Sequence, residues 1–503
     1  MFDYIIVQAG GKGTRLKHLT ANKPKALVPV DNLPMLFHLF RKYPDKKFIV
    51  IGDYKYDVLE KYLAVFAGVQ YIAVNAKGAP GTCGGVRGAL AYLPEQAPFM
   101  LIWCDLVLPE NFAVPGKTAD YVGISKGFIC RWKYEDGKFE ETPSDEFGVA
   151  GLFVFTDKSK LADVPWEGEF VRWLQNKNTL FGTIPLYETK EFGLLEEYEK
   201  LGSPRCRPFN RIEETSDGKL IKCGIDGQGR GLAEREKNWY RAARKLGFVC
   251  TPEIYSFEPF IMEKISGRNI WEDEFTREQR LEILGKLIDA LKSLHGKDSV
   301  PADYFSIKEA YVAKTFSRID KIRNLIPFAD ERYITVNGRK CHNIYYFRGK
   351  LAERFANYRV SEFKFIHGDC TFSNMLLRGG LEPVLIDPRG YFGFTENYGD
   401  PVYDWAKLYY SVVGSYDRFN VKRFRLAIGE YDVRLQIEPN AWSDLEPEFF
   451  RLLDGEAEPA DIRLIHAVIW MSLSTYAWED YDSVCGAFYN GLYYLEDALW
   501  GKD

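Results

Sequence analysis

The feature that most constrains the fold is a regular alternation of short apolar runs with helical runs over the first hundred residues. YIIVQ, FIVIGDY, VQYIAVN and FMLIWCD have the length and composition of strands, and MLFHLFRKY, YDVLEKYLAVF and CGGVRGALAYL between them have helical spacing. This alternation predicts βαβ units and an α/β fold with a doubly wound, mostly parallel sheet. Ligands of such sheets bind beyond the carboxyl ends of the strands.

The pattern changes after LGSPRCRP, at residues 201–208. NRIEET and KLIKC, joined by Ser-Asp-Gly, predict a hairpin, and a helical run and two further strands, PEIYSF and PFIMEKISG, follow. From Phe275 the chain reads as largely helical. We therefore divide the 503 residues into an α/β domain, 1–202, and an α+β domain, 203–503, with a small lobe at about 203–266 and a helical lobe at about 267–503.

Composition excludes several classes of protein. The net charge is −5, which argues against nucleic-acid or anionic-membrane partners. Neither a signal peptide nor a membrane span is indicated, and the nine cysteines are scattered singly, without zinc spacing. We expect a cytoplasmic protein with reduced cysteines, whose partners are small molecules and nucleotides; the sequence does not indicate an oligomeric state.

Three ends of predicted strands carry groups suited to phosphate chemistry. A glycine-rich loop, QAGGKGTRL, follows the first strand and brings Arg15 with it. Two prolines in KPKALVPV stiffen the segment that carries Lys25. Asp105 ends the strand FMLIWCD, where a carboxylate suits Mg²⁺ or, in a structural role, caps a turn.

In the second half, HGDCTFSNMLL and LIDPRG place Asp369, Asn374 and Asp387 between apolar runs. The five-residue spacing matches the catalytic loop of protein kinases, in which the Asp is the base and the Asn binds Mg²⁺. Lys222 ends a small-lobe strand, and Glu236 lies on the following helix with Glu234 as its competitor.

The first half, residues 1–202, resembles nucleotidyltransferases that join a nucleoside triphosphate to a phosphorylated sugar or alcohol. The resemblance implies that Arg15 and Lys25 contact phosphates and that Asp105 binds Mg²⁺. It assigns the second metal ligand to Glu188, with Glu191 as the alternative, because Lys190 stands where relatives carry Asp. It also implies nucleotide binding by Gln8, Ala9, Gly10, Gly11, Gly13, Thr14, Gly81 and Thr82.

The second half resembles the choline kinase and aminoglycoside phosphotransferase superfamily through IMEKISG, LKSLHG, HGDCTFSNML, LIDPRG and GDPVYDWAKL. The resemblance implies a bilobal, protein-kinase-like fold with Asp369 as base, Asn374 and Asp387 as Mg²⁺ ligands, and Lys222 with Glu236 on the triphosphate of ATP. Asp404 would brace the catalytic loop, and Met262, Glu263 and Ile265 would meet the adenine. Two departures are the missing glycine-rich loop and LIDPRG in place of LIDWEY.

Together the halves predict a bifunctional enzyme that uses ATP, a second nucleoside triphosphate (CTP, UTP or GTP) and Mg²⁺ at both sites. It would phosphorylate a small sugar, polyol or amino alcohol and then activate the product for surface-glycan, capsule or cell-wall synthesis. Alternatives are a non-catalytic kinase-fold module and an antibiotic-type phosphotransferase with an acidic groove. The aromatic residues Trp470, Tyr476 and Trp478, with Asp480 and Asp482, are interpreted either as an ammonium box or as packing residues.

Overall fold

The computed structural model describes residues 2–116, 119–177, 179–199, 210–268, 270–272 and 274–501. The chain forms two compact units, Met1–Ser203 with Trp478–Asp482, and Pro204–Ala477 with Ser483–Asp503. The predicted boundary at 202/203 lies outside the described residues. The sequence suggested two consecutive ranges, but the structure assigns Trp478–Asp482 to the first unit. No local pattern in the sequence marks these five residues as part of that unit.

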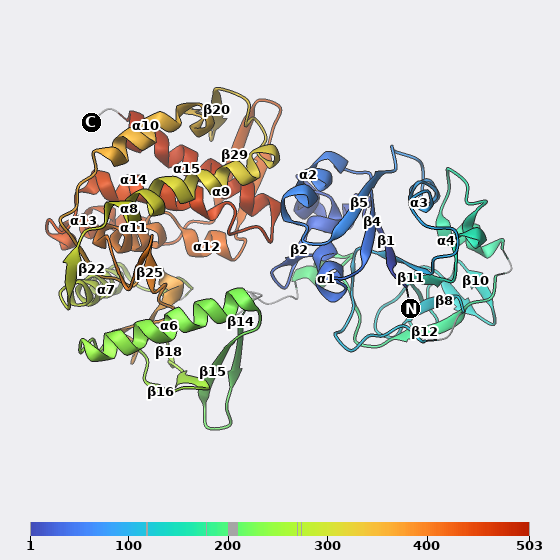
Figure 1. Cartoon of the computed structure of the whole chain (residues 1–503), viewed down its shortest axis with the longest axis horizontal. Coiled ribbons are helices and arrows are strands. Elements are labelled where there is room, and N and C mark those ends of the chain that lie inside the picture. Colours follow the sequence, from blue (N-terminus) through green and yellow to red (C-terminus); the bar gives the residue numbers. More distant parts are fainter. Residues whose placement is uncertain are drawn as a thin grey trace. The chain divides into compact units, whose positions relative to one another are not determined.

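The first unit is built on a seven-stranded sheet (Figure 1). The strands β1, β4, β5 and β6 pair in parallel, and β12 runs parallel to β8, whereas β11 is antiparallel to both of its neighbours. The predicted doubly wound, mostly parallel sheet is therefore confirmed. In sheet order the strands are β12 (Gly182–Leu186), β8 (Tyr121–Ser125), β11 (Val149–Phe155), β6 (Phe99–Trp103), β1 (Tyr4–Gln8), β4 (Lys47–Gly52) and β5 (Gln70–Asn75).

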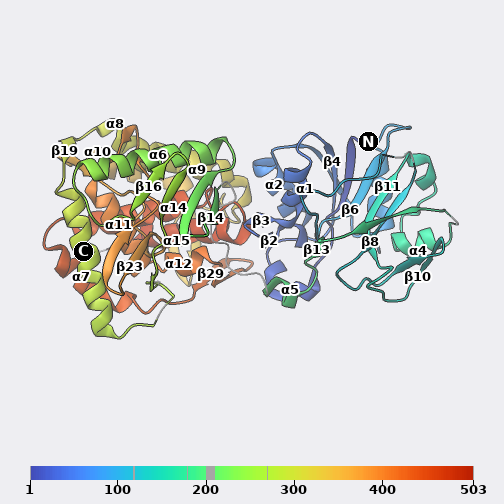
Figure 2. The ribbon, with the colours of Figure 1, turned by 90° about the horizontal axis from the view of Figure 1, so that it is seen from below.

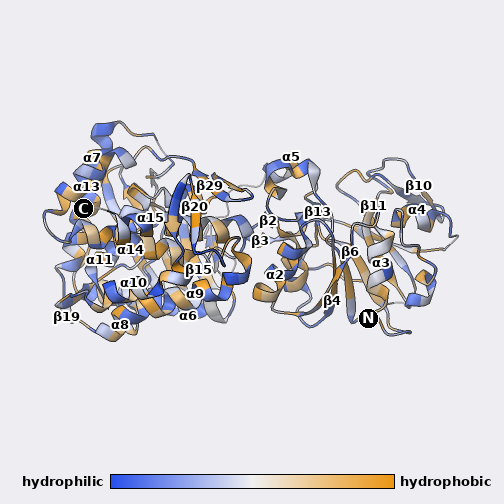
Figure 3. Cartoon of the chain, turned by 90° about the horizontal axis from the view of Figure 1, so that it is seen from above, coloured by the Kyte–Doolittle hydropathy of each residue, from blue (hydrophilic) through white to orange (hydrophobic). Residues whose placement is uncertain are grey.

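Helices and short hairpins complete this unit. Residues of the inner strands, such as Ile6, Ile49 and Leu101, are apolar and almost fully buried. Figure 3 colours each residue of the chain by its hydropathy. The helices are α1 (Met35–Lys42), α2 (Tyr56–Phe66), α3 (Cys83–Leu90), α4 (Phe170–Gln175) and α5 (Leu195–Glu199). The short strands are β2 (Pro29–Val30), β3 (Leu33–Pro34), β7 (Leu106–Val107), β9 (Lys133–Glu135), β10 (Lys138–Glu140) and β13 (Lys190–Glu191).

The second unit begins with a four-stranded antiparallel sheet, and the long helix α6 (Gly227–Lys245) lies along it (Figures 1 and 2). Its strands, in order, are β14 (Asn210–Glu214), β15 (Lys219–Gly224), β17 (Phe260–Glu263) and β16 (Ile254–Phe257). The predicted hairpin is β14–β15, and Gly218 supplies the positive φ of 76° that its turn requires. This sheet is the small lobe.

The rest of the second unit is mainly helical, as expected from Phe275 onwards. The helices are α7 (Arg277–His295), α8 (Tyr304–Lys308), α9 (Lys314–Ile322), α10 (Ile344–Ala356), α11 (Pro401–Val412), α12 (Tyr416–Asn420), α13 (Glu446–Leu453), α14 (Pro459–Leu473) and α15 (Tyr481–Trp500). α14 packs against both α9 and α11. No described helix has both the length and the apolar character needed to cross a bilayer.

Small sheets interrupt the helices. One of these sheets, which has four strands, was not predicted from the sequence. That sheet contains β20 (Tyr333–Val336), β21 (Arg339–His342), β29 (Asp432–Ile437) and β28 (Phe424–Ile428). The catalytic-loop region has β18 (Gly267–Arg268), β23 (Met375–Arg378) and β24 (Glu382–Leu385). The remaining strands are β19 (Ser299–Pro301), β22 (Glu362–Phe365), β25 (Tyr391–Phe392), β26 (Thr395–Glu396) and β27 (Tyr398–Gly399).

The described cysteines are free thiols, and most are buried. Cys223 on β15 differs from these, because it is exposed. Alternation along the hairpin strand explains the difference, because Lys222 points inward and its neighbour must point out.

Candidate active sites

The loop after β1 has the open surface that an anion-binding turn needs. Gly13 has φ 62°, and a Cβ there would lie 3.1 Å from the Cβ of Lys25, so only glycine lets the loop pass this close. A Cβ on Gly11 would meet open space. Arg15 is exposed on the turn that follows. The loop therefore offers backbone N–H groups and a cation beside Lys25.

Lys25 is buried and lies between two carboxylates. Its Nζ donates to Asp105 and stands 3.8 Å from Glu191 Oε1. Burial disfavours the charged form of every member of this group, yet the Lys25 charge prevails at Asp105 and holds the pKa of that carboxyl below its ordinary value. At Glu191, burial and the Asp105 charge raise the pKa.

Glu191, rather than Glu188, is the carboxylate that the fold brings to Asp105. Strand β13 pairs Glu191 with Leu106, next to Asp105, and Phe192 N donates to Asp105 O at 3.2 Å. Glu188 is exposed in the turn before β13, with φ 56°. This geometry favours the alternative, Glu191, over Glu188 as the carboxylate beside Asp105, because the chain turns at Glu188 and pairs with β7 only two residues later.

The step Gly81–Thr82 is packed tightly at the start of α3. A Cβ on Gly81 would lie 2.2 Å from the carbonyl oxygen of Gly168, and Thr82 N donates to that oxygen at 2.9 Å. Gln8 Nε2 donates to Thr82 O at 3.1 Å, which ties the end of β1 to this turn. Gln8, the glycine loop and Gly81–Thr82 thus lie along one edge of the sheet.

The Lys25 group suits a divalent cation. Two carboxylates with one lysine leave a net negative charge, and oxygen ligands of this kind are those that Mg²⁺ prefers. Asp105 and Glu191 are the residues that would hold it. Among the described residues, no group of three or more His, Cys, Asp or Glu side chains is placed so that it could hold a metal ion.

The second unit repeats this arrangement with different residues. Lys222 Nζ lies 2.7 Å from Glu236 Oε2 and also pairs with Asp387. Burial raises the pKa of Glu236 to about 7, although the Lys222 charge acts to lower this pKa. Glu234 instead pairs with Lys237 on the surface of α6, so the geometry distinguishes between the two glutamates that the sequence left open.

Asp369 and Asn374 are joined within the catalytic loop. Asn374 Nδ2 donates to Asp369 Oδ2 at 3.0 Å and to its backbone oxygen at 2.8 Å, which turns the amide oxygen of Asn374 away from Asp369. Ile386 N donates to Asn374 O at 2.9 Å, next to Asp387. Asn374 and Asp387 thus keep oxygen atoms that fit a Mg²⁺ ion.

Asp404 braces this loop from α11, as the resemblance implies. Its carboxylate accepts hydrogen bonds from His367 N at 2.9 Å and Gly368 N at 2.7 Å, and His295 Nε2 lies 3.0 Å away. Asp404 has no solvent exposure. His295, on α7, is therefore a buried partner of Asp404.

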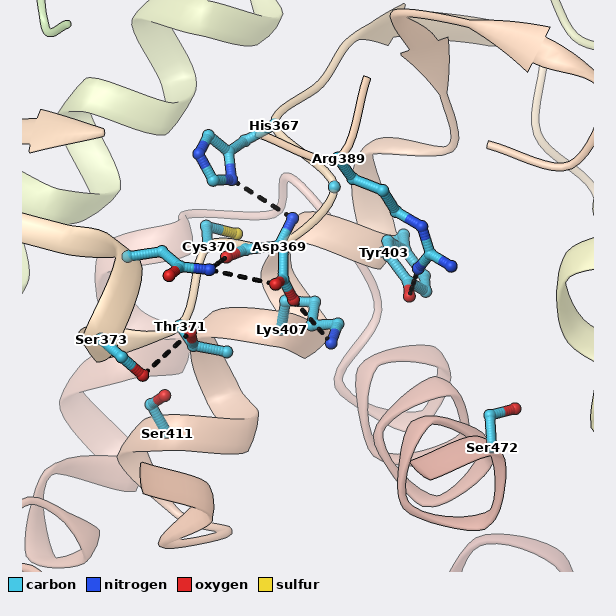
Figure 4. A network of polar contacts seen from close by, with 12 residues as sticks. His367, Asp369, Cys370, Thr371, Ser373, Arg389, Tyr403, Lys407, Ser411 and Ser472 are labelled. Carbon is cyan, nitrogen blue, oxygen red and sulfur yellow. Dashed lines mark hydrogen bonds and ion pairs between the residues drawn. The ribbon is translucent and has the colours of Figure 1, made fainter. Parts of the chain in front are cut away.

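The sequence reading missed Lys407, one turn beyond Asp404 on α11. Its Nζ lies 2.9 Å from Asp369 Oδ1 (Figure 4). Burial would raise the pKa of Asp369, but the Lys407 charge outweighs it and keeps the pKa below its ordinary value. The signal was present in GDPVYDWAKL, where the lysine follows the bracing Asp by three residues, on the same face of the helix.

The predicted adenine segment ends β17. Met262 is buried, and the Glu263 carboxylate accepts from Arg378 Nη2 at 2.6 Å, which occupies its side chain structurally. Ile265 follows in an irregular segment. Backbone groups after Met262 are the part of this segment that remains suited to a base.

The aromatic residues near the C-terminus are engaged in packing. Trp470 is fully buried and donates to His466 Nε2 at 3.0 Å, whereas Trp478 packs on Phe37 in the first unit. Asp480 and Asp482 pair with Lys23. These contacts favour the interpretation of Trp470 and Trp478 as packing residues.

The acidic residues considered as a groove for cationic drugs are engaged elsewhere. Glu446 accepts from Arg463 Nη2 at 2.9 Å, and Glu448 pairs with Arg277. They lie on α13 and neutralise basic side chains. This weakens the comparison with aminoglycoside-binding enzymes.

Family models match two separate parts of the chain, one within each unit. The model of a MobA-like NTP transferase domain matches residues 5–114, and the model of the phosphotransferase enzyme family matches residues 227–435. The site residues Gln8 to Asp105 fall in the first range, and Glu236, Asp369, Asn374 and Asp387 fall in the second.

Curated relatives match part of the chain. It is 28% identical over 163 residues to UTP–glucose-1-phosphate uridylyltransferase AglF of Haloferax volcanii, 32% of this chain and 63% of that protein. It is 31% identical over 96 residues to D-glycero-alpha-D-manno-heptose 1-phosphate guanylyltransferase of Campylobacter jejuni, 18% and 43% of the two chains. The chain thus spans less than two thirds of these relatives.

Among solved structures, the inositol-1-phosphate CTP transferase from T. maritima has 19% identity and a TM-score of 0.33, covering 39% of this chain and 91% of its own. The CTP:phosphocholine cytidylyltransferase LicC from Streptococcus pneumoniae has 18% identity and a TM-score of 0.32, covering 40% and 98%.

Proposed function

Because the chain joins a nucleotidyltransferase domain to a phosphotransferase domain, we propose that it carries out two successive reactions on one small molecule. The second unit phosphorylates a hydroxyl group with ATP, and the first unit transfers a nucleotidyl group onto the new phosphate. The observation that carries this proposal is that each unit holds a buried lysine between two carboxylates, beside groups suited to phosphates. The Lys222 group serves the phosphorylation step, and the Lys25 group serves the nucleotidyl transfer.

In the kinase step, Asp369 accepts the proton of the acceptor hydroxyl as its oxygen attacks the γ-phosphorus of ATP and ADP leaves. Lys407 holds Asp369 ionised, so the carboxylate is ready to act as a base. Lys222, positioned by Glu236, contacts the triphosphate. Asn374 and Asp387 would hold Mg²⁺, which neutralises charge on the phosphates when bound.

In the nucleotidyl step, an oxygen of the substrate phosphate attacks the α-phosphorus of the second nucleoside triphosphate, and pyrophosphate leaves. No protein base is needed, because the phosphate is already ionised near neutral pH. Arg15 and Lys25 offset the charge that develops on the pyrophosphate, while the loop of Gly10 to Thr14 provides N–H donors. Asp105 and Glu191 would hold the metal there.

Sugars are the acceptor class that the relatives favour. The names of AglF and of the heptose guanylyltransferase describe transfer to sugar 1-phosphates with UTP and a guanylyl donor. A kinase acting on the anomeric hydroxyl would supply such a phosphate. The product, a nucleotide-activated sugar, is a precursor for surface-glycan, capsule or cell-wall assembly, and the reactions would take place in the cytoplasm.

The test separates the two steps with one variant of each unit. Asp369→Asn should lose ADP formation by about 10²–10⁴-fold yet still release pyrophosphate from a supplied sugar 1-phosphate and nucleoside triphosphate. Asp105→Asn should show the opposite pattern and accumulate the phosphorylated sugar. The proposal is abandoned if neither ADP nor pyrophosphate formation responds to its own variant.

A non-catalytic kinase-fold module remains the competing function for the second unit. The joined arrangement of Lys222, Glu236, Asp387, Asn374 and Asp369 argues for turnover. If the wild-type protein and the Asp369→Asn variant consume ATP at the same background rate, the result favours the binding module.

A further inference from the structure

Four basic side chains gather beside the proposed catalytic base. Lys407 pairs with Asp369 from α11, and Arg389 follows Asp387 in the loop, with its Nη1 donating to Tyr403 Oη at 2.6 Å. Figure 4 shows Arg389 and Tyr403 next to the Asp369–Lys407 pair. Helix α9 adds Lys314 and Arg318, one turn apart on the same face.

Tyrosines connect these cations into one cluster. Arg389 Cζ lies 4.7 Å and Lys314 Nζ 5.8 Å from the ring centre of Tyr391. Arg318 Nη1 donates to Ser472 O at 2.7 Å. The cluster, Lys314, Arg318, Arg389 and Lys407, thus lines the part of the helical lobe that adjoins Asp369.

The cluster carries more positive charge than its surroundings neutralise. Asp369 pairs with Lys407, and Glu309 lies near Lys314, but in the described parts of the chain Lys314, Arg318 and Arg389 form no ion pair with a carboxylate. Burial, and then the charges of Arg389, Arg318 and Lys407, hold the pKa of Lys314 well below its ordinary value. Half-buried cations that repel one another are costly unless an anion joins them.

We propose that this cluster binds an anionic group of the kinase acceptor, so that the acceptor is a hydroxyl compound carrying a carboxylate or a phosphate. The proposal rests on the kinase function given above and specifies its substrate class. The nucleotide side of Asp369 is already served by Lys222, Asn374 and Asp387, so the cluster is free for the acceptor. A choline-like or aminoglycoside-like cation would be repelled there.

The first experiment compares acceptors that share one ring and differ in charge. Glucose, glucosamine, glucuronate and glucose 6-phosphate are assayed for ATP-dependent ADP release by the whole chain. We expect one of the two anions to have a kcat/KM at least about tenfold above that of glucose, and glucosamine to be the poorest. Glucuronate and glucose 6-phosphate distinguish a carboxylate from a phosphate. Preference for glucose or glucosamine overturns the proposal.

Variants then assign the preference to the cluster. Arg318→Gln and Lys314→Met should raise the acceptor KM about tenfold or more while leaving the KM for ATP within about twofold, and Arg318→Lys should retain part of the binding. Arg434→Gln, which removes an exposed arginine of β29, is the matched control. A rise in the KM for ATP instead would mean that the cluster binds the nucleotide, and would refute the acceptor assignment.

A binding measurement decides the matter even if none of these sugars is the acceptor. Inorganic sulfate is titrated calorimetrically into the chain saturated with Mg²⁺ and ADP, which occupy the nucleotide side. Wild type should bind sulfate, and Arg318→Gln and Lys314→Met should bind it at least about tenfold more weakly than Arg434→Gln does. Equal sulfate binding in all variants overturns the inference. A failure of the kinase proposal itself is distinct, because ATP would then be consumed at an Asp369-independent rate with every acceptor.

Discussion

Single buried residues of this chain take their properties from what surrounds them. His466 is a clear case: its Nε2 accepts from Trp470, which places its proton on Nδ1, and Nδ1 is buried without a partner. Burial lowers the pKa of His466 to about 3. The imidazole is therefore neutral in the folded chain near neutral pH.

This gives a signed pH dependence of stability. An unfolded His466 takes up a proton near pH 6.5, whereas the folded one does so only near pH 3, so the second unit loses stability as pH falls through this window. Between pH 6.5 and 5 the loss is roughly 2 kcal/mol from this residue. The His466→Gln variant keeps an acceptor for Trp470. In urea unfolding between pH 6.5 and 5, its free energy of unfolding should fall by roughly 2 kcal/mol less than that of the wild type.

Equal pH slopes of wild type and His466→Gln would contradict this account. A variant that is less stable at pH 7 but has a flatter slope would still support it, because packing and titration are read separately.

At the scale of elements, helix α11 holds the catalytic loop in place. It begins at Asp400, whose side chain caps Val402 N at 3.0 Å with Pro401 in the first turn, so its start is well defined. Asp404 and Lys407, one turn apart, then face the loop together. The same helix therefore positions both Asp404, which holds the loop backbone, and Lys407, which pairs with Asp369.

Replacing Asp404 by Ala leaves two buried backbone N–H groups, those of His367 and Gly368, without acceptors. We expect a loss of about 3 kcal/mol in the free energy of unfolding of the second unit. Kinase kcat should fall, while the KM for ATP changes little, because Asp404 contacts the loop and not the nucleotide.

Asp404→Asn is the matched control, since one acceptor oxygen is kept, and it should be the milder change in both respects. If Asp404→Ala raises only the KM for ATP, the loop is not what Asp404 positions.

In the first unit, the segment Trp478–Asp482 is held by Lys23. Its Nζ lies 2.9 Å from Asp480 Oδ1 and also pairs with Asp482, and Lys23 is 2% exposed. Lys23→Met would leave two neighbouring buried carboxylates uncompensated. We expect a loss of about 3–5 kcal/mol in the local stability of this unit.

Amide hydrogen exchange of β1 and β4 measures that loss. Lys46→Met, which removes a surface pair with Asp3, is the comparison and should cost under about 1 kcal/mol. Similar exchange rates in the two variants would show that the buried pair contributes nothing beyond a surface one.

At the scale of the whole molecule, the proposed function requires two separate nucleotide sites, and a binding measurement tests this requirement. In Asp387→Asn, which impairs the second unit, Mg²⁺ with CTP, UTP or GTP should still raise the melting temperature through the first unit. A ligand at about a hundredfold its Kd stabilises by about 2.7 kcal/mol, which is readily detected.

The nucleoside triphosphate that stabilises most identifies the donor. Adding Asp105→Asn to the same chain should remove the shift. A shift by none of CTP, UTP and GTP would remove the basis for assigning nucleotidyl transfer to the first unit.

Much of this architecture is readable from the sequence, for local reasons. The strand ending at Gln8 and the helix Tyr56–Phe66 coincide with their apolar runs, because period and length are local properties. The spacing of Asp369 and Asn374 within one loop already implies that they meet, and Asp387 follows the strand that pairs with β23, which begins directly after Asn374. The sequence by itself thus determined the two domains, their order and the acidic residues of the kinase loop.

Only the tertiary structure decided which distant side chains share an environment. Glu191 rather than Glu188 reaches Asp105 because β13 turns back on β7, and Glu236 rather than Glu234 reaches Lys222 because of the angular position of each residue on α6. The cluster of Lys314, Arg318, Arg389 and Lys407 draws on two helices and a loop. No local pattern encodes it, since electrostatic environment depends on distances that the folded chain alone sets.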